Sequence, residues 1–186
     1  MKNLKFSRLF AAMMFVACLM FVGCDPVTNE KITTVDNYII VRPLEADEAI
    51  IGTWTDGGQK FEIQNNNFKN SYLYGSWQEA YTGNNLIINY TSTTSGYIYM
   101  KYTKAIMPDY SYSEEAPDVG KWYALAFKDL NITDTTSSVK IAGAWKDDAV
   151  NAFEKLEDAI KAFTVENGYF ATFNDVNKEY FNFFPA

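Results

Sequence analysis

Residues 50–74 read IIGTWTDGGQKFEIQNNNFKNSYLY, and this stretch decides the fold class. Runs rich in Ile, Phe, Tyr and Thr alternate there with the short turn sequences DGG and NNN. β-Branched and aromatic residues favour strands, and Asp-Gly or Asn-rich pairs tolerate the backbone of tight hairpins. The same alternation of strand-like runs and turn residues continues to residue 104, with the runs SWQEAY, LIINYT and YIYMKYTK. It predicts an antiparallel meander of short strands.

Two more strands are predicted beyond residue 119, in GKWYALAFKDL and VKIAGAW. In the first of them Tyr123, Leu125 and Phe127 share one face, and Trp122 shares the other face with two alanines. Side chains alternate between the two faces of a strand, so both faces of this strand are apolar. The pattern predicts a strand that is covered on both sides, or an inner face with room for a ligand.

Residues 147–163 change to a helical period, with apolar residues on one stripe and charged residues opposite. Asp147 is the expected N-cap, and Asn167-Gly168 is expected to close the helix. One or two last strands are expected in GYFATF and KEYFNFF. The order predicts a mainly β fold, an antiparallel up-and-down barrel of about eight short strands with one amphipathic helix before the last strand. Closure into a barrel removes exposed strand edges.

All four tryptophans follow a glycine by two residues, in GTW at 52–54, GSW at 75–77, GKW at 120–122 and GAW at 143–145. Glycine lets a strand bend, and the tryptophan two residues later faces the same side and can close a barrel end. Gly52-Thr53-Trp54 resembles the G-x-W signature of lipocalins and related calycin barrels. GSW followed by NLII at 85–88 resembles the G-x-W…N-x-L pattern of small bacterial lipocalin-like domains.

The resemblance covers roughly residues 49–184 and implies a lipocalin-like barrel with Gly52 and Trp54 at one end. Lipocalins usually place an arginine over the first tryptophan, and this chain has arginines only at positions 8 and 42. Either Lys178 makes a cation–π contact in its place, or that contact is absent.

The N-terminus has the composition of a secretory signal. Lys2, Lys5 and Arg8 precede the uncharged run LFAAMMFVACLMFV at 9–22, which is shorter than the roughly 20 residues of a bilayer span. The sequence FVGC at 21–24 resembles a bacterial lipobox, although Phe21 replaces the usual aliphatic residue. The resemblance implies that the signal peptide is cleaved off before Cys24, and that Cys24 is lipidated with fatty acids such as palmitate. Lipidation at Cys18 and an uncleaved anchor helix are the alternatives.

This interpretation divides the chain into three parts: a lipoprotein signal peptide at 1–23, the lipidated cysteine and a polar tether at 24–48, and the barrel domain at 49–186. It places the protein in the bacterial cell envelope, outside the cytoplasm and anchored to the inner or the outer membrane by its N-terminal lipid. Cleavage leaves a single cysteine, so a disulfide within the mature protein is excluded.

The net charge is −7, and removal of the three basic residues of the signal segment makes the mature protein more acidic. An acidic body argues against nucleic acid as a partner and against docking on anionic lipid. The chain has no histidine, which excludes imidazole catalysis and histidine metal ligands. No carboxylate pair has the spacing of a glycosidase or calcium motif. We therefore expect a binding protein without enzymatic activity, cofactor or metal.

The leading hypothesis is that the barrel binds a small apolar ligand in its lumen. The candidate lumen residues are Phe61, Ile63, Trp77, Leu86, Ile88, Tyr123, Leu125 and Phe127. The alternative is a protein-interaction or inhibitor module that acts through the acidic, tyrosine-rich loop 105–119 on an extracytoplasmic protein. Its candidate residues are Tyr110, Tyr112, Glu114 and Glu115.

Overall fold

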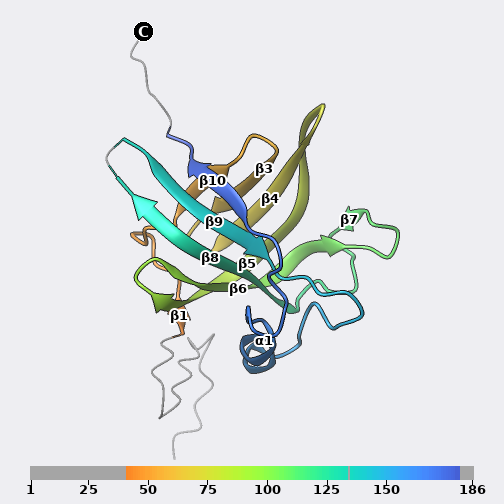
Figure 1. Ribbon diagram of the computed structural model, residues 1–186. Coiled ribbons are helices and arrows are strands. Elements are labelled where there is room, and N and C mark those ends of the chain that lie inside the picture. The colour runs from red at the N-terminus through yellow and green to blue at the C-terminus, as the bar shows by residue number, and fades with distance from the viewer. Residues whose placement is uncertain (1–40, 134, 181–186) are drawn as a thin grey trace, which may run out of the picture.

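The computed structural model describes residues 41–133 and 135–180, which form a closed antiparallel β-barrel (Figure 1). The predicted signal peptide, Cys24 and most of the predicted tether lie outside the described residues. The elements are β1 (Arg42–Pro43), β2 (Gly52–Thr55), β3 (Gln59–Ile63), β4 (Asn67–Tyr74), β5 (Ser76–Ser92), β6 (Ser95–Ile106), β7 (Tyr112–Ser113), β8 (Trp122–Ile132), β9 (Ser137–Gly143), α1 (Leu156–Ala162) and β10 (Asn174–Lys178).

Eight strands close the barrel, because each pairs antiparallel with the next. The pairing runs from β2 through β3, β4, β5, β6, β8 and β9 to β10, which pairs with β2 again. The predicted up-and-down barrel with one helix before the last strand is therefore confirmed. Closure leaves the main strands without a free edge over most of their length.

The segment before β2 closes one end of the barrel, which we call the base. Arg42 and Pro43 form β1 and pair with β5, and Val41 and Leu44 beside them are buried. Glu48 forms an ion pair with Arg42 and accepts a hydrogen bond of 2.8 Å from the Tyr90 hydroxyl. The packed part of the chain therefore begins earlier than Ala49, the start expected from the sequence. Apolar and polar residues do not alternate in this segment as they do in a strand, so the sequence gives no local sign that it packs on the barrel.

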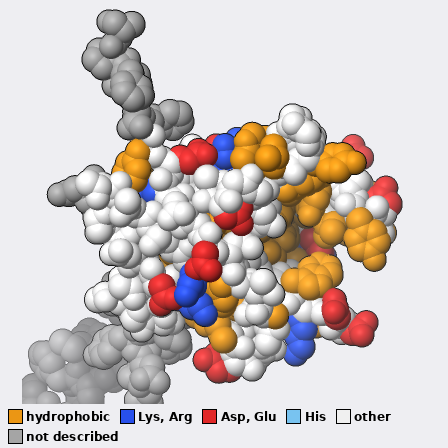
Figure 2. Space-filling view, turned by 45° about the horizontal axis from the view of Figure 1, so that its top comes forward, with side chains coloured by type: hydrophobic (Ala, Val, Ile, Leu, Met, Phe, Trp, Pro, Cys, Tyr) orange, Lys and Arg blue, Asp and Glu red, His pale blue; other side chains and the backbone are white. Residues whose placement is uncertain are grey.

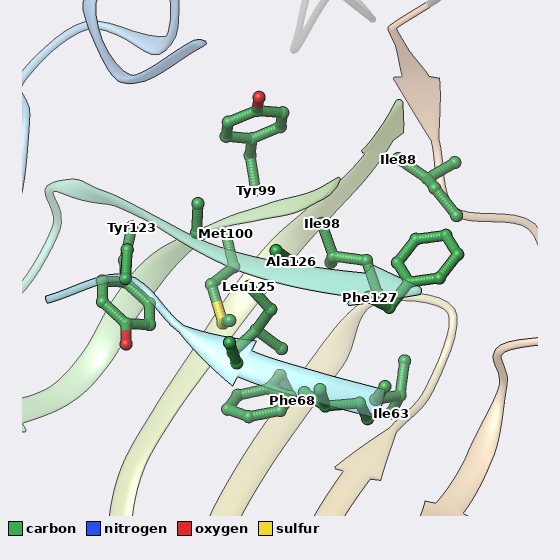
Figure 3. Packing of buried hydrophobic residues seen from close by; sticks show 14 of the residues in the cluster. Ile63, Phe68, Ile88, Ile98, Tyr99, Met100, Tyr123, Leu125, Ala126 and Phe127 are labelled. Carbon is green, nitrogen blue, oxygen red and sulfur yellow. The ribbon is translucent and has the colours of Figure 1, made fainter. Parts of the chain in front are cut away.

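The lumen above the base is filled by apolar side chains. Figure 3 shows Met100 and Leu125 on one side of their strands and Tyr99 on the opposite side. Leu125, which is fully buried, lies opposite Ile98 of β6 and Gly143 of β9. The buried residues that share this cluster include Trp54, Phe61, Ile63, Phe68, Leu86, Ile88, Phe127 and Ile141.

The outer face of β6 and β8 is covered as well. The helix α1 packs on these two strands, and the ring of Phe170 lies 5.6 Å from that of Tyr97 on β6. Ala124 and Ala126 are buried on this outer face, where their small side chains let the covering segment approach. The prediction that residues 122–127 form a strand covered on both sides is confirmed.

The helix is shorter than predicted, because only Leu156–Ala162 is helical. The side chain of Asn151 accepts a hydrogen bond from the Lys146 amide at 2.8 Å and donates to the Lys146 carbonyl at 2.9 Å. The backbone of Phe153 pairs with Trp122 of β8 through bonds of 2.9 and 2.6 Å. These partners replace helical hydrogen bonds, so a helix from 147 is wrong. Asp147 accepts a bond from Trp145 Nε1 instead of capping a helix.

The end of the helix agrees with the sequence pattern. Asn167 Nδ2 donates to the last carbonyls of α1, those of Lys161 and Ala162, at 3.0 and 2.9 Å. The last strand β10 comes from NDVNK, which follows GYFATF and shares its last residue, Lys178, with KEYFNFF. Residues 181–184 of KEYFNFF lie outside the described residues. Within residues 41–133 and 135–180, no helix has the length and apolar character needed to cross a membrane.

Trp54 occupies the base as the G-x-W resemblance implied. It is fully buried, and its indole N–H donates to the Ile50 carbonyl at 2.8 Å. Lys178 lies opposite it on β10, with its ammonium nitrogen 5.3 Å from the Trp54 ring centroid. The cation–π contact expected for Lys178 is therefore present.

Candidate ligand-binding site at the barrel mouth

The barrel wall divides at the end opposite the base, which we call the mouth. Strands β5 and β6 are paired from Ser92 and Ser95 up to Thr82 and Lys104. Beyond that point β5 pairs only with β4 in a projecting hairpin, and β6 pairs with β7. Figure 1 shows the β4–β5 hairpin and β7 pointing in different directions. Figure 2 shows the surface hollowed on the right of the view, with hydrophobic side chains gathered around the hollow.

Three tyrosines, which we call the inner tyrosines, meet on the lumen side where the wall divides. They are Tyr81 of β5, Tyr102 of β6 and Tyr123 of β8. The ring centroids of Tyr102 and Tyr123 are 4.6 Å apart in a stacked arrangement. The ring of Tyr81 meets both edge-on, at 6.0 Å from Tyr102 and 5.4 Å from Tyr123. Such stacked and edge-to-face pairs are the favoured geometries of aromatic rings.

Tyr123 is buried, and Tyr81 and Tyr102 are half-buried. Burial raises the pKa of all three phenols well above the ordinary value of 10.0, and the electrostatic effect of the neighbouring phenols raises it further. The hydroxyl oxygens of Tyr81 and Tyr123 both lie close to Gly143. The phenols of the cluster therefore stay protonated well into the alkaline range.

Two further tyrosines lie between this cluster and the solvent. Burial raises the pKa of Tyr112 on β7, and so does the nearby hydroxyl of Tyr72 on β4. Tyr112 also acts electrostatically on all three inner tyrosines. Tyr72 is 39% exposed and Tyr112 is half-buried, so the two tyrosines lie near the surface on the two strands that separate where the wall divides.

The glycine of GAW makes room for the inner tyrosines. A Cβ atom at Gly143 would lie 2.4 Å from the Tyr123 hydroxyl oxygen and 3.0 Å from that of Tyr81. No real Cβ approaches an oxygen so closely, so this position must stay free of a side chain. The G-x-W pattern has a different cause at Gly75, which has a φ of 70° at the turn between β4 and β5. The G-x-W pattern therefore has different causes at Gly143 and Gly75.

The structure separates the predicted lumen residues into two groups. Phe61, Ile63, Leu86, Ile88, Leu125 and Phe127 belong to the buried cluster below the mouth. Tyr123 alone among the predicted residues reaches the inner tyrosine cluster. The sequence analysis missed Tyr72, Tyr81 and Tyr102, and the alternation of aromatic residues in β5 and β6 was the available signal.

Trp77 does not line the lumen, which corrects the sequence-based prediction. Between the pairs Lys69–Thr82 and Ser71–Glu79, β4 advances by two residues and β5 by three, so β5 carries a bulge. A bulge reverses the alternation of side chains that follows it. Trp77 is accordingly 40% exposed, and the Lys60 ammonium nitrogen lies 4.4 Å from its ring centroid.

Loop 105–119 is ordered by short-range hydrogen bonds. The Asp109 carboxylate accepts from the amide and the hydroxyl of Ser111 at 3.0 and 2.6 Å. Ala116 is buried and anchors the loop on the barrel. Glu114 and Glu115 are exposed, and Tyr110 is 80% exposed. Of the residues predicted for an interaction surface, only Tyr112 is turned toward the mouth.

The charged groups near the mouth are largely paired. Lys104 lies 3.0 Å from Glu79, and Lys121 lies 2.9 Å from Asp118. In the described part of the chain, no three His, Cys, Asp or Glu residues come together to hold a metal ion. Comparison of the chain with protein-family models, with curated proteins and with solved structures gives no match.

Proposed function

We propose that this chain is a lipid-anchored extracytoplasmic binding protein with a lipocalin-like barrel, and that it takes a small, largely apolar ligand at the mouth. The observation that carries the proposal is the cluster of tyrosines where the wall divides, above a packed core. Below the mouth, the protein's own side chains fill the lumen. The ligand is therefore expected between the inner tyrosines, Tyr72 and Tyr112.

Tyrosine suits such a site because each ring offers an apolar face and a hydroxyl that donates and accepts hydrogen bonds. Ligand sites in proteins commonly combine apolar walls with a few polar groups that fix orientation. Figure 2 shows the surface hollowed where hydrophobic side chains gather, so a ligand can enter there without unfolding the barrel. The preformed ring stacking reduces the entropy cost of binding.

A second candidate function is a protein-interaction or inhibitor module that acts through loop 105–119. The exposure of Tyr110 beside Glu114 and Glu115 favours it, because exposed aromatic residues often anchor interfaces. The two functions place the important side chains differently. A ligand carrier depends on Tyr112 and Tyr72, and an interaction module depends on Tyr110.

The proposal is tested with the neutral fluorescent probe N-phenyl-1-naphthylamine and the chain from residue 24 on, which contains every described residue. We expect saturable binding at micromolar concentrations. Tyr112→Leu and Tyr72→Leu should each weaken it by about five- to tenfold, since an aromatic contact contributes about 0.5–1.5 kcal/mol beyond its area. Tyr180→Leu, which removes a tyrosine beside Ser137 away from the mouth, is the matched control and should leave binding unchanged.

Absence of saturable binding to the unchanged chain would refute the ligand-carrier proposal. Equal weakening by Tyr180→Leu would show that the probe binds at no particular site. If a protein partner is captured and the capture is lost with Tyr110→Ala but retained with Tyr112→Leu, the interaction module is supported instead.

A further inference from the structure

We infer that the ligand of the mouth is an organic cation with a hydrophobic body, such as an aromatic or alkyl quaternary ammonium. This inference rests on the proposed function and names the chemical class of its ligand. It follows from the aromatic rings and the charges around the mouth.

The ring faces provide the first argument. Each aromatic ring has a negative face, which attracts a cation within about 6 Å of its centroid. The mouth gathers five tyrosines from separate strands, and the inner three lie 4.6 to 6.0 Å from one another. A ligand at the mouth therefore meets a group of rings that come from three strands. Several aromatic rings around one cation are the usual means by which proteins recognise quaternary ammonium groups.

The outer wall of the barrel already holds an ammonium group on an aromatic face. Lys60 Nζ lies 4.4 Å from the ring centroid of Trp77, which pairs with Leu73 near the tip of the β4–β5 hairpin. The lysine also lies 3.7 Å from the Glu179 carboxylate, so the cation is shared between a ring and a carboxylate. This is the combination of groups that we expect a ligand cation to find inside the mouth.

The charges around the mouth provide the second argument. Loop 105–119, which brings Tyr112 to the mouth, carries four carboxylates and neither lysine nor arginine. The four are Asp109, Glu114, Glu115 and Asp118. The carboxylate of Asp118 acts on the Tyr102 phenol, so its field reaches the inner tyrosines. The two lysines that flank the loop are held by Glu79 and Asp118.

An anionic ligand would meet the opposite conditions. It would face the negative ring faces and the carboxylates of the loop, with Lys104 and Lys121 already engaged in ion pairs. A neutral apolar ligand would gain the apolar contact but nothing from the charges. A hydrophobic cation gains from both, which makes it the class that the mouth fits best.

The test uses two isosteric compounds that differ only in charge, phenyltrimethylammonium and tert-butylbenzene, with benzenesulfonate as the anion. Each is titrated against bound N-phenyl-1-naphthylamine on the chain from residue 24 on. We expect the cation to compete at least about tenfold better than its neutral isostere at low salt, which corresponds to about 1.4 kcal/mol. Benzenesulfonate should compete more weakly than either. Added salt should reduce the preference for the cation, because the carboxylate contribution is screened.

One pair of variants tests the ring, and one double substitution tests the charge. Tyr112→Phe keeps the ring and should keep the preference, whereas Tyr112→Leu should reduce it to less than about threefold. The double change of Glu114→Gln and Glu115→Gln should lower the preference at low salt and have no effect at high salt. Both glutamates are exposed, so the fold is expected to survive.

The outcomes distinguish this inference from the proposed function. If the probe binds and the neutral isostere competes as well as the cation, the ligand class is wrong and the site remains. If benzenesulfonate competes best, the site prefers an anion and the inferred charge of the ligand is wrong. If the probe does not bind at all, the proposed function fails and this inference fails with it.

Discussion

Replacement of Leu125 by alanine measures whether the lumen below the mouth is packed or holds a ligand. Leu125 is fully buried between Ile98 and Gly143, and the glycine has no side chain that could move into the space. The change removes three carbon atoms, and a transfer term of about 0.8 kcal/mol per carbon gives roughly 2.4 kcal/mol. The residual cavity adds to this, so the expected loss of unfolding free energy is about 3 to 4 kcal/mol.

The assay is urea unfolding followed by tryptophan fluorescence. With a denaturant slope of about 2 kcal/mol per molar, the transition midpoint should fall by roughly 1.5 to 2 M while the slope stays constant. Leu73→Ala on the β4–β5 hairpin is the control, since its side chain is half exposed and its loss should cost less than about 0.5 kcal/mol. A loss below about 1 kcal/mol for Leu125→Ala would refute the packed lumen.

Three other predictions follow from the sequence and the structure. Cys24→Ser should abolish incorporation of a labelled fatty acid and release the protein from membranes; retained label would exclude Cys24, and loss of label with Cys18→Ser alone would assign that cysteine instead. The inner tyrosines have folded-state pKa values above the unfolded value near 10, so their contribution to stability is full below pH 10 and is lost as the pH rises further. Ultraviolet absorbance of phenolate should therefore show a group of tyrosines that ionises only when the protein unfolds in alkali. Full ionisation of a protein that is still folded would contradict this. Asn151→Ala should destabilise the protein by about 1 to 3 kcal/mol, because it leaves backbone groups of the segment before α1 without partners; an unchanged thermal midpoint would show that water replaces the side chain.

The class of fold could be predicted from the sequence. Strand periods, turn residues and one amphipathic stripe are local features, because backbone conformation and side-chain alternation are set within a few residues. They were sufficient for the eight-stranded barrel, for the two covered faces of β8 and for the end of α1 at Asn167. Trp54 and Lys178, more than 100 positions apart, were paired through the family resemblance rather than through any local pattern.

The tertiary structure alone decided the site. One extra residue in β5 turned Trp77 outward, and no local pattern shows where two strands will accommodate a bulge. The helix does not begin at residue 147, because the backbone of Phe153 pairs with that of Trp122 on β8, which lies 31 positions earlier in the chain. The tyrosines of the mouth come from five strands and meet only after the barrel closes and its wall divides. Such contacts depend on strand register and packing between distant segments, and the energies that set them do not exist until those segments are in contact.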